Sequence, residues 1–344
     1  MKMTRRQMIL GSAATLSLWT AGGLPGLSLA RAADVKTLKI SHQFPSQGDF
    51  RNDLCKRFGA EVEKRTNGAL KFQVYPGSSL MKTEAQFNAV EMGALDLTLY
   101  PLPYAAGHVR ELGIGLMPGL VTSYANATAW RNADIGKALV QLLDAKGIVM
   151  LSWVWQAGGV ASRPRAIVEP ADAKDLKIRG GSRAMDRMLE AAGASVISLP
   201  SNELYADMQT GVMDAALTSS TSLMSFKLDE VSKFLTAPSH EAAYWFMLNG
   251  LLMSKDSFNQ LSKAQQDVIR QVGAEMDPYD VQGAEADDRS VAAVYGKAGA
   301  KVVSLDKATV QKWREIARNS AWKDYAAQTK DCARFLKLAQ QVQA

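Results

Sequence analysis

The chain has 344 residues, enough for two domains of ordinary size. Its composition, 47% hydrophobic and 22% charged with 26 Gly and 11 Pro, is typical of a soluble globular protein and excludes a disordered, collagen-like or disulfide-rich scaffold. Two cysteines and three histidines exclude a cysteine-rich zinc or iron–sulfur site. We therefore expect no cofactor and no bound metal.

The net charge of +6 does not indicate a nucleic-acid partner. Four basic residues lie within the first 33 residues, where they have no acidic counterpart. Without Lys2, Arg5, Arg6 and Arg31 the formal charge falls to +2, so the rest of the chain is close to neutral. We expect no nucleic acid to bind.

Residues 1–32 have the pattern of an export signal. A basic stretch (1–8) precedes an uncharged apolar stretch (9–30), and Ala30-Arg31-Ala32 is an A-x-A cleavage site. Glycines and Pro25 within the apolar stretch disfavour a membrane anchor. Residues 4–10 (TRRQMIL) resemble the twin-arginine export motif, so the sequence predicts a periplasmic protein.

The first elements after the signal follow a β-α-β order. Thr37–Ser41 alternates as a half-buried strand. A helix is predicted from Asp49 to Lys64, with apolar residues every fourth position from Phe50. Leu70–Tyr75 then alternates strictly and ends at a Pro-Gly turn. This order indicates an α/β fold with largely parallel sheets.

Further elements continue this pattern and then change to helices. After a helix at about 82–92, strands are predicted at Leu95–Tyr100, Ile148–Trp155, Leu176–Arg179 and Ser195–Leu199. Beyond residue 256 the predicted elements are the helices Ser262–Met276, Pro278–Lys297 and Lys307–Lys337.

The candidate catalytic motifs in the sequence are all incomplete. The segment His240–Tyr244 begins like a metalloprotease H-E-x-x-H but ends in Tyr, so it lacks the second zinc ligand. Gly113–Gly119 is glycine-rich, but Pro118 removes a backbone amide that a phosphate loop needs. Cys55 and Cys332 lie on separate predicted helices and are expected to be buried free thiols.

Several motifs together resemble one family. Residues 58–80 (FGAEVEKRTNGALKFQVYPGSSL) strongly resemble the opening of the periplasmic solute-binding proteins of TRAP transporters, the DctP family. Matches follow in chain order at Glu91–Leu97 (EMGALDL), Ala173–Arg179 (AKDLKIR) and Glu203–Asp214 (ELYADMQTGVMD). The resemblance covers essentially residues 35–340.

The resemblance implies a two-lobed periplasmic binding protein fold of α/β type, with crossing segments and a long C-terminal helix. Lobe 1 would contain 33–156 and about 246–284, and lobe 2 would contain 157–245 and about 285–344. A small-molecule carboxylate would be enclosed between the lobes and delivered to small and large TRAP membrane subunits. The receptor itself would be a monomer or a homodimer.

The resemblance also places an arginine at the ligand. Arg179 matches the family's carboxylate-binding arginine, and a planar guanidinium suits a bidentate carboxylate pair. Other residues expected near the ligand come from strand ends, from hydroxyl-bearing segments and from the aromatic residues near the lobe crossings. They are His42, Trp155, Gln156, Ser182, Ser201, Thr218 and Trp245.

Two departures from better-known members suggest a less charged site. Gly159 stands where those members carry a further arginine, and Leu217 and Thr218 replace a Glu and an Asn. The sequence therefore favours a monocarboxylate, aromatic or hydroxylated, over a dicarboxylate. A second cation from Arg163, Arg165 or Arg183 stays open, as do an ABC-type binding protein and a periplasmic cofactor enzyme.

Overall fold

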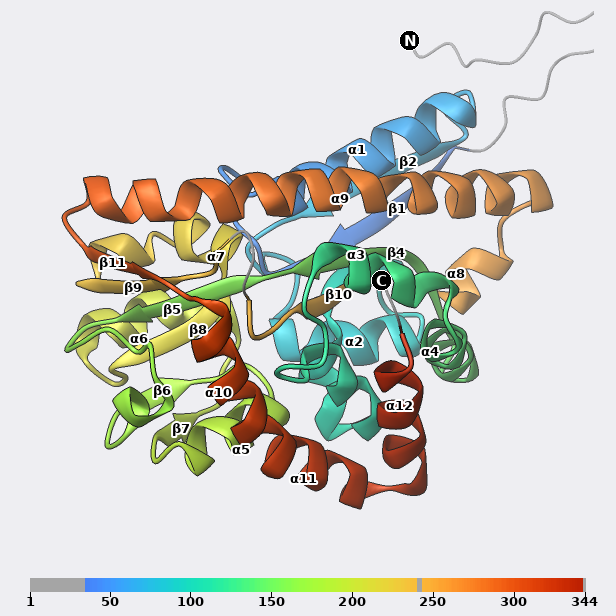
Figure 1. Ribbon diagram of the computed structural model, residues 1–344. Helices are drawn as coiled ribbons and strands as arrows, with labels where there is room; N and C mark the ends of the chain where they lie inside the picture. The colour runs from blue at the N-terminus through green and yellow to red at the C-terminus, as the bar shows by residue number, and fades with distance from the viewer. Residues whose placement is uncertain (1–34, 240–242, 343–344) are drawn as a thin grey trace, which may run out of the picture. The chain divides into compact units, whose positions relative to one another are not determined.

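The computed structural model describes residues 35–239 and 243–342 as an α/β protein with two mixed sheets (Figure 1). The export-signal prediction for 1–32 lies outside these residues, and so do His240 and Glu241 of the rejected metalloprotease motif. Apolar residues between the sheets and the helices form the hydrophobic cores.

The first sheet has the strand order β2-β1-β3-β10-β4. Strands β1, β2 and β3 are parallel, whereas β10 is antiparallel to both β3 and β4. The strands are β1 Lys36–Ser41, β2 Leu70–Tyr75, β3 Leu97–Pro101, β4 Ile148–Gln156 and β10 Met247–Ser254. Patterns in the sequence predict all of these strands except β10, whose burial on both faces removes the alternation of apolar and polar residues.

The second sheet has the order β11-β9-β5-β8-β6-β7. Here β5 is antiparallel to β8 and β9, and the remaining pairs are parallel. The strands are β5 Gly158–Ser162, β6 Lys177–Arg179, β7 Ser195–Ile197, β8 Ala215–Ser219, β9 Phe234–Ala237 and β11 Lys301–Ser304. Since β4 and β5 are separated only by Ala157, residues 148–162 cross directly from one sheet to the other.

Helices cover both sheets. The α-helices are α1 Phe50–Arg65, α2 Thr83–Glu91, α3 Tyr124–Ala129, α4 Asp134–Ala145, α5 Arg183–Ala191, α6 Leu204–Thr210, α7 Ser220–Ser225, α8 Lys255–Asn259, α9 Lys263–Lys297, α10 Lys307–Asn319, α11 Ala321–Gln328 and α12 Lys330–Gln340. Short 3-10 helices include η1 Leu102–Gly107, η2 Arg110–Leu116 and η5 Ser201–Glu203. None of the helices in the described residues is both long and apolar enough to cross a bilayer.

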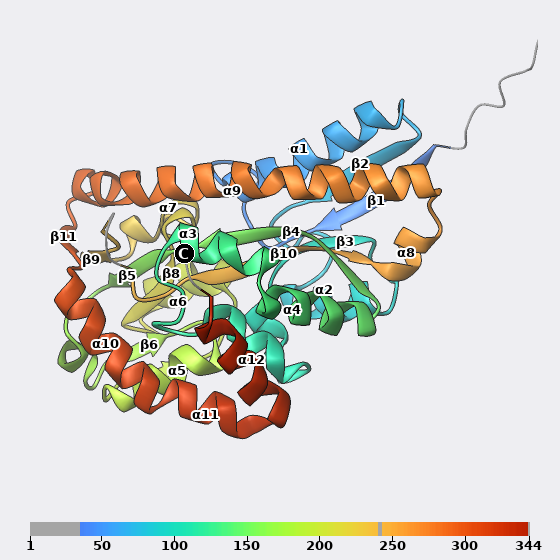
Figure 2. The ribbon, with the colours of Figure 1, turned by 45° about the vertical axis from the view of Figure 1, so that its right-hand side comes forward.

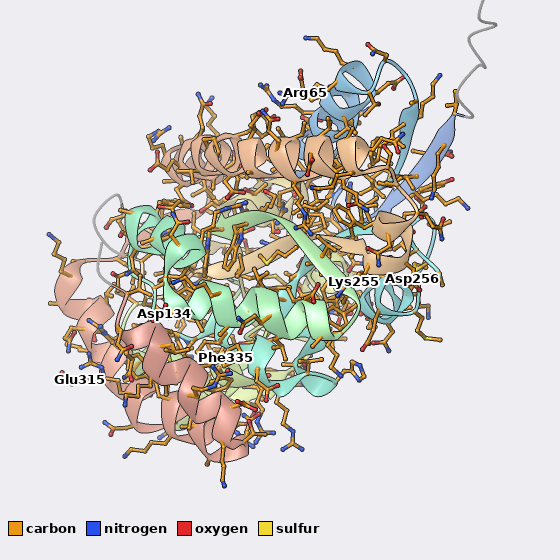
Figure 3. The ribbon with its side chains drawn as sticks, turned by 90° about the vertical axis from the view of Figure 1, so that its right-hand side faces the viewer. Arg65, Asp134, Lys255, Asp256, Glu315 and Phe335 are labelled. Carbon is orange, nitrogen blue, oxygen red and sulfur yellow. The ribbon has the colours of Figure 1, made fainter. Side chains whose placement is uncertain are left out.

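The start of α1 is determined by its cap. Asp49 accepts a hydrogen bond from the backbone N–H of Arg51, which satisfies one of the free donors of the first turn. The predicted apolar face of this helix is buried, from Leu54 through Phe58 to Val62. At its other end Arg65 lies beside α9 (Figure 3), where Nη1 and Nη2 of its guanidinium donate to Glu275 at 2.9 and 2.5 Å.

Helix α9 corrects the predicted break at Pro278. The chain continues as one helix from Lys263 to Lys297, with the proline inside it. Proline removes one backbone hydrogen bond, but packing along α1, β4 and α7 outweighs this local cost. Figure 1 shows α9 running from α1 near one end to α7 near the other, so this one helix contacts elements of both sheets.

The final segment is also divided differently from the prediction. In place of one helix over Lys307–Lys337, three helices follow one another on the side away from α9 (Figure 2). The breaks fall at Ser320 and Thr329, whose backbones leave the helical region. The Thr329 hydroxyl then caps α12 by accepting from the Cys332 N–H at 2.9 Å.

Carboxylates of α9 hold the crossing strand. Asp277 accepts from the backbone N–H of Trp153 at 2.9 Å, and Asp280 accepts from that of Trp155 at 2.7 Å. Burial raises the pKa of the Asp280 carboxyl well above its usual range. Strand β4 therefore has its backbone fixed to α9 just before the chain passes from the first sheet to the second.

Candidate functional site

A small inner cavity lies where loops of the two sheets meet. It is about 10 Å³, which is room for about one water-sized sphere. A larger molecule enters only if the walls move apart. Its lining comes from both sheets and their loops: Gln43, Phe44, Arg51, Pro101, Tyr104, Gln156, Ser201, Thr218, Ser219, Ser222, Met247 and Asn249.

Three buried amide side chains on this lining have unpaired polar atoms. Neither amide atom of Gln43 makes a hydrogen bond within the described residues, and the same holds for the side-chain oxygens of Gln156 and Asn249. Each of these residues is at most 1% exposed. Buried polar atoms are normally paired, so these atoms indicate a polar ligand in the cavity.

Hydrogen bonds behind the wall fix two of these amides. The Nε2 of Gln156 donates to Trp155 O at 3.1 Å and to Asp280 Oδ1 at 3.3 Å. The Nδ2 of Asn249 donates to Val154 O at 3.1 Å. Because backbone carbonyls only accept hydrogen bonds, Trp155 O and Val154 O require the amide nitrogens on their side. The unpaired atoms of Gln156 and Asn249 are therefore acceptor oxygens.

Arg179 ends β6 and is fully buried. Its Nε and Nη1 donate to the carbonyls of Leu199 and Leu217, both at 2.9 Å, and Nη2 donates to the Tyr104 hydroxyl at 2.5 Å. A guanidinium has five N–H donors, so two make no hydrogen bond to the described residues. Arg179 itself is not part of the cavity lining, but it contacts Tyr104, which is.

The backbone next to Arg179 requires glycine. Gly181 has φ +89°, and a Cβ there would lie 2.5 Å from Arg179 Nη1. Glycine thus lets the chain turn closely around the guanidinium. Gly159 also accepts no side chain, because its Cβ would lie 2.2 Å from Thr236 O. The arginine of better-known members therefore has no room at position 159.

One arginine of the described residues does line the cavity, but it is not one that the sequence suggested. Arg51, in the first turn of α1, is 2% exposed and its guanidinium lies 3.7 Å from the Phe44 ring centroid. Its Nε and Nη2 donate to the two carboxylate oxygens of Asp49 at 2.8 and 2.6 Å. The predicted helix is an ordinary amphipathic one, and nothing in its pattern signals that the Arg51 side chain is buried.

The arginines considered earlier lie elsewhere. Arg165 is exposed and donates to the carbonyls of Asp172 and Lys174, and Arg163 lies beside Gly211. Arg183 pairs with Asp324 at 2.8 Å on the wall of a second, outer cavity. None of the three belongs to the lining of the inner cavity.

The outer cavity is about 690 Å³ and meets the inner one at Tyr104, which lines both. Ser182 lies on this outer wall as the cap of α5, where its hydroxyl accepts from Met185 N at 3.1 Å and donates to Leu116 O at 3.2 Å. Burial raises the pKa of Asp186, in the same helix, to about 7, and the Arg179 charge opposes this rise.

The residues predicted for the ligand thus divide into two groups. The structure brings Gln156, Ser201 and Thr218 together on the inner cavity, with Arg179 behind Tyr104. Trp155 instead faces a groove beside α9, because neighbouring residues on a strand point to opposite faces. Trp245 packs close to Gly158, outside the inner lining.

His42 lies near the cavity without lining it. The ring is fully buried and stacks on Phe44 at 5.7 Å. Burial lowers the pKa of His42 to about 4, so the imidazole is neutral at neutral pH. Sequence reasoning missed its neighbour Gln43, although both follow β1 at the edge where α/β proteins bind ligands.

Other reactive groups offer little chemistry here. The described residues contain no group of three His, Cys, Asp or Glu side chains that could hold a metal ion. Cys55 and Cys332 are both buried free thiols. Burial raises the pKa of the Cys55 thiol above its usual range, so it stays protonated and unreactive at neutral pH.

An α/β fold with two lobes and a closed polar cavity between its two sheets is typical of solute-binding proteins. Residues 40–329 match the family model of the bacterial extracellular solute-binding proteins, family 7 (DctP). The chain belongs to this DctP family, the family of TRAP solute-binding proteins, whose members bind solutes for transport and are not catalysts. The ABC-type and enzyme alternatives are therefore set aside.

Individual relatives agree with this assignment. A solute-binding protein of Albidiferax ferrireducens is 55% identical over 98% of this chain and 99% of its own. The crystal structure of a TRAP periplasmic solute-binding protein from Rhodoferax ferrireducens, with bound malonate, is 59% identical with a TM-score of 0.87, over 89% of this chain and 98% of that one. The 2,3-diketo-L-gulonate-binding periplasmic protein YiaO of Escherichia coli is 28% identical over 85% of this chain and 88% of its own.

Proposed function

We propose that this receptor binds a compact, hydroxylated monocarboxylate in the inner cavity. The observation that carries the proposal is the pair of acceptor oxygens on Gln156 and Asn249, on a cavity next to Arg179. Arg179 would bind the carboxylate and the amides would bind the rest of the molecule.

The carboxylate assignment rests on the unused donors of Arg179. Its bonds to Leu199 O and Leu217 O hold the guanidinium in place, so little side-chain entropy remains to be lost on binding. A charge-assisted pair in a closed, dry cavity is strong. As the walls separate to admit a ligand, these donors become reachable beside Tyr104.

The hydroxyl assignment rests on hydrogen-bond complementarity. The fixed oxygens of Gln156 and Asn249 accept hydrogen bonds and cannot donate them. A hydroxyl on the ligand supplies a donor to such an oxygen, whereas an ionised second carboxylate supplies only acceptors. Two acceptors facing each other would leave both unpaired, which is costly in a buried site.

A short dicarboxylate is the second candidate. The Rhodoferax ferrireducens relative holds malonate, and Arg51 gives the cavity of this chain a second guanidinium. Asp49 already neutralises Arg51 through two hydrogen bonds, so a second ligand carboxylate gains less from this cation. An aromatic acid has less support, because Trp155 and Trp245 lie outside the lining.

We also propose how the receptor works in the cell. The two sheets would belong to two lobes, 33–156 with about 246–284 and 157–245 with about 285–344, which separate to admit the acid. Closure around it would present the loaded receptor to the small and large TRAP membrane subunits. The twin-arginine motif at Arg5 and Arg6 would direct export to the periplasm.

Calorimetric titration with a panel of acids tests the ligand class. The panel consists of lactate, 2-hydroxybutyrate, glycerate and mandelate beside malonate, succinate and malate, at one pH and ionic strength. We expect a compact hydroxy monocarboxylate to bind most tightly. Tighter binding of a dicarboxylate would favour the second candidate, and no binding of any acid would overturn the proposed function.

A further inference from the structure

Tyr104 stands between the two cavities. It belongs to η1, directly after β3, and its side chain lines both the inner cavity and the outer cavity of about 690 Å³. The ring packs edge-on against Tyr100 at 6.1 Å, and the Arg179 guanidinium lies 5.7 Å from its centroid. The ring therefore has a defined position as the wall that the two cavities share.

The hydroxyl of Tyr104 has its acceptor capacity filled. Its oxygen accepts from Arg179 Nη2 at 2.5 Å and from the backbone N–H of Ser201 at 3.2 Å. A phenol oxygen has two acceptor positions and one proton to donate. Both acceptor positions are used, and the proton finds no acceptor among the described residues. An O–H donor thus remains beside the unused donors of Arg179.

We propose that Tyr104 determines the specificity of the acid site in two ways. Its O–H donates to the ligand carboxylate beside Arg179, and its ring closes the inner cavity against the outer one, which limits ligand length. This inference rests on the proposed function. It identifies the residue that separates compact acids from longer ones.

The two roles predict different effects of two substitutions. Tyr104→Phe keeps the ring and removes the hydroxyl, that is, the O–H donor together with the acceptor for Arg179 Nη2 and Ser201 N–H. It therefore weakens a compact acid without admitting a longer one. Tyr104→Ala removes the ring as well and joins the cavities. A longer chain then extends toward the outer wall, where Pro103, Ala184 and Leu199 offer apolar contact.

Calorimetry with 2-hydroxybutyrate and 2-hydroxyoctanoate tests both roles. We expect Tyr104→Phe to weaken 2-hydroxybutyrate about tenfold, the loss of about one hydrogen bond to a charged group. We expect Tyr104→Ala to weaken it at least as much and to bind 2-hydroxyoctanoate at least tenfold more tightly than the unaltered protein. The control Tyr100→Phe, on the outer wall beside the same ring, should change neither acid more than about twofold.

The outcomes separate this inference from the proposed function. If the unaltered protein binds 2-hydroxybutyrate and Tyr104→Phe stays within about twofold, the donor role is wrong. If Tyr104→Ala is folded by circular dichroism and gains no affinity for 2-hydroxyoctanoate, the length-limiting role is wrong. If the unaltered protein binds no acid of the panel, the proposed function fails, and this inference fails with it.

Discussion

Arg51 and Asp49 form a buried ion pair that joins the two sheets. Arg51 Nη2 lies 2.6 Å from Asp49 Oδ2 at the start of α1, beside the first sheet. The same guanidinium donates to Ser219 at 3.3 Å and to Ser222 at 3.0 Å, at the end of β8 and in α7 of the second sheet. Ser225 of α7 donates to Asp49 at 2.8 Å. The pair therefore links elements of both sheets at the wall of the inner cavity.

Neutralising Asp49 should change ligand preference. In Asp49→Asn the amide still caps α1, but Arg51 keeps its full charge on the cavity wall. We expect malonate to bind at least tenfold more tightly, a gain of about 1.4 kcal/mol, while 2-hydroxybutyrate changes less than about threefold. Calorimetry with both acids measures the preference.

A matched control is Asp53→Asn, an exposed acid of the same helix turn. It should leave both affinities unchanged. Breaking a buried pair costs about 3–5 kcal/mol, so Asp49→Asn should also melt at a lower temperature, and malonate should restore part of the loss. Unchanged malonate affinity in a folded Asp49→Asn protein would show that Arg51 does not reach the ligand.

Asp186 should make acid binding depend on pH. Burial raises the pKa of this carboxyl to about 7, so it is neutral below that pH and ionised above it. Ionised Asp186 competes with the ligand for the field of Arg179. We expect the affinity for 2-hydroxybutyrate to fall about two- to fivefold between pH 5.5 and 8.5. This change corresponds to a coupling free energy of about 0.5–1 kcal/mol between ionised Asp186 and the bound acid.

The substitution Asp186→Asn should flatten this profile and hold the affinity near its low-pH value. It should also make the protein more stable than the unaltered one at high pH. Because folding raises the pKa of Asp186, the free energy of unfolding of the unaltered protein falls as pH rises from the ordinary pKa of 3.8 to about 7. Asp134→Asn, at the exposed start of α4 (Figure 3), serves as control. A profile as steep in Asp186→Asn as in the unaltered protein would assign the pH dependence to another group.

Local patterns in the sequence predicted α1 and the strands β1–β4, β6 and β7, but not β5 or β8–β11, and only part of the site wall. Strand alternation alone places Trp155 and Gln156 on opposite faces of β4, so they cannot both face one cavity. Arg51 gives no such signal, because its burial depends on Ser219 and Ser222, which are distant in sequence. Pro278 indicated a helix end, and only contacts of α9 with both sheets explain why the helix continues.

Family motifs predicted Arg179 but not its surroundings. Tyr104 lies in a 3-10 segment with no periodic pattern, so nothing local indicates that its hydroxyl meets Arg179. Gly181 does carry a local signal, because a glycine that follows a short strand often marks a positive φ. In the structure the backbone at Gly181 passes against the Arg179 guanidinium.

Export should depend on both signal arginines. Replacing Arg5 and Arg6 together with lysine keeps the charge but alters the twin-arginine motif. We expect periplasmic fractions to lose the protein and the cytoplasm to retain the longer, unprocessed chain. The mature protein from the unaltered gene should begin at about residue 33, which mass spectrometry reads directly. Unchanged export of the double variant would point to a signal of the general secretory type.

Calorimetry on Arg179→Ala beside Arg183→Ala tests whether Arg179 binds the ligand carboxylate. Arg183 is the matched control, an arginine four positions further on that faces the outer cavity and pairs with Asp324. With 2-hydroxybutyrate, Arg179→Ala should lose more than a hundredfold in affinity, since a buried carboxylate without its cation costs about 3–5 kcal/mol. Arg183→Ala should stay within about threefold. Binding by folded Arg179→Ala within tenfold of the unaltered protein would show that Arg179 does not bind the carboxylate.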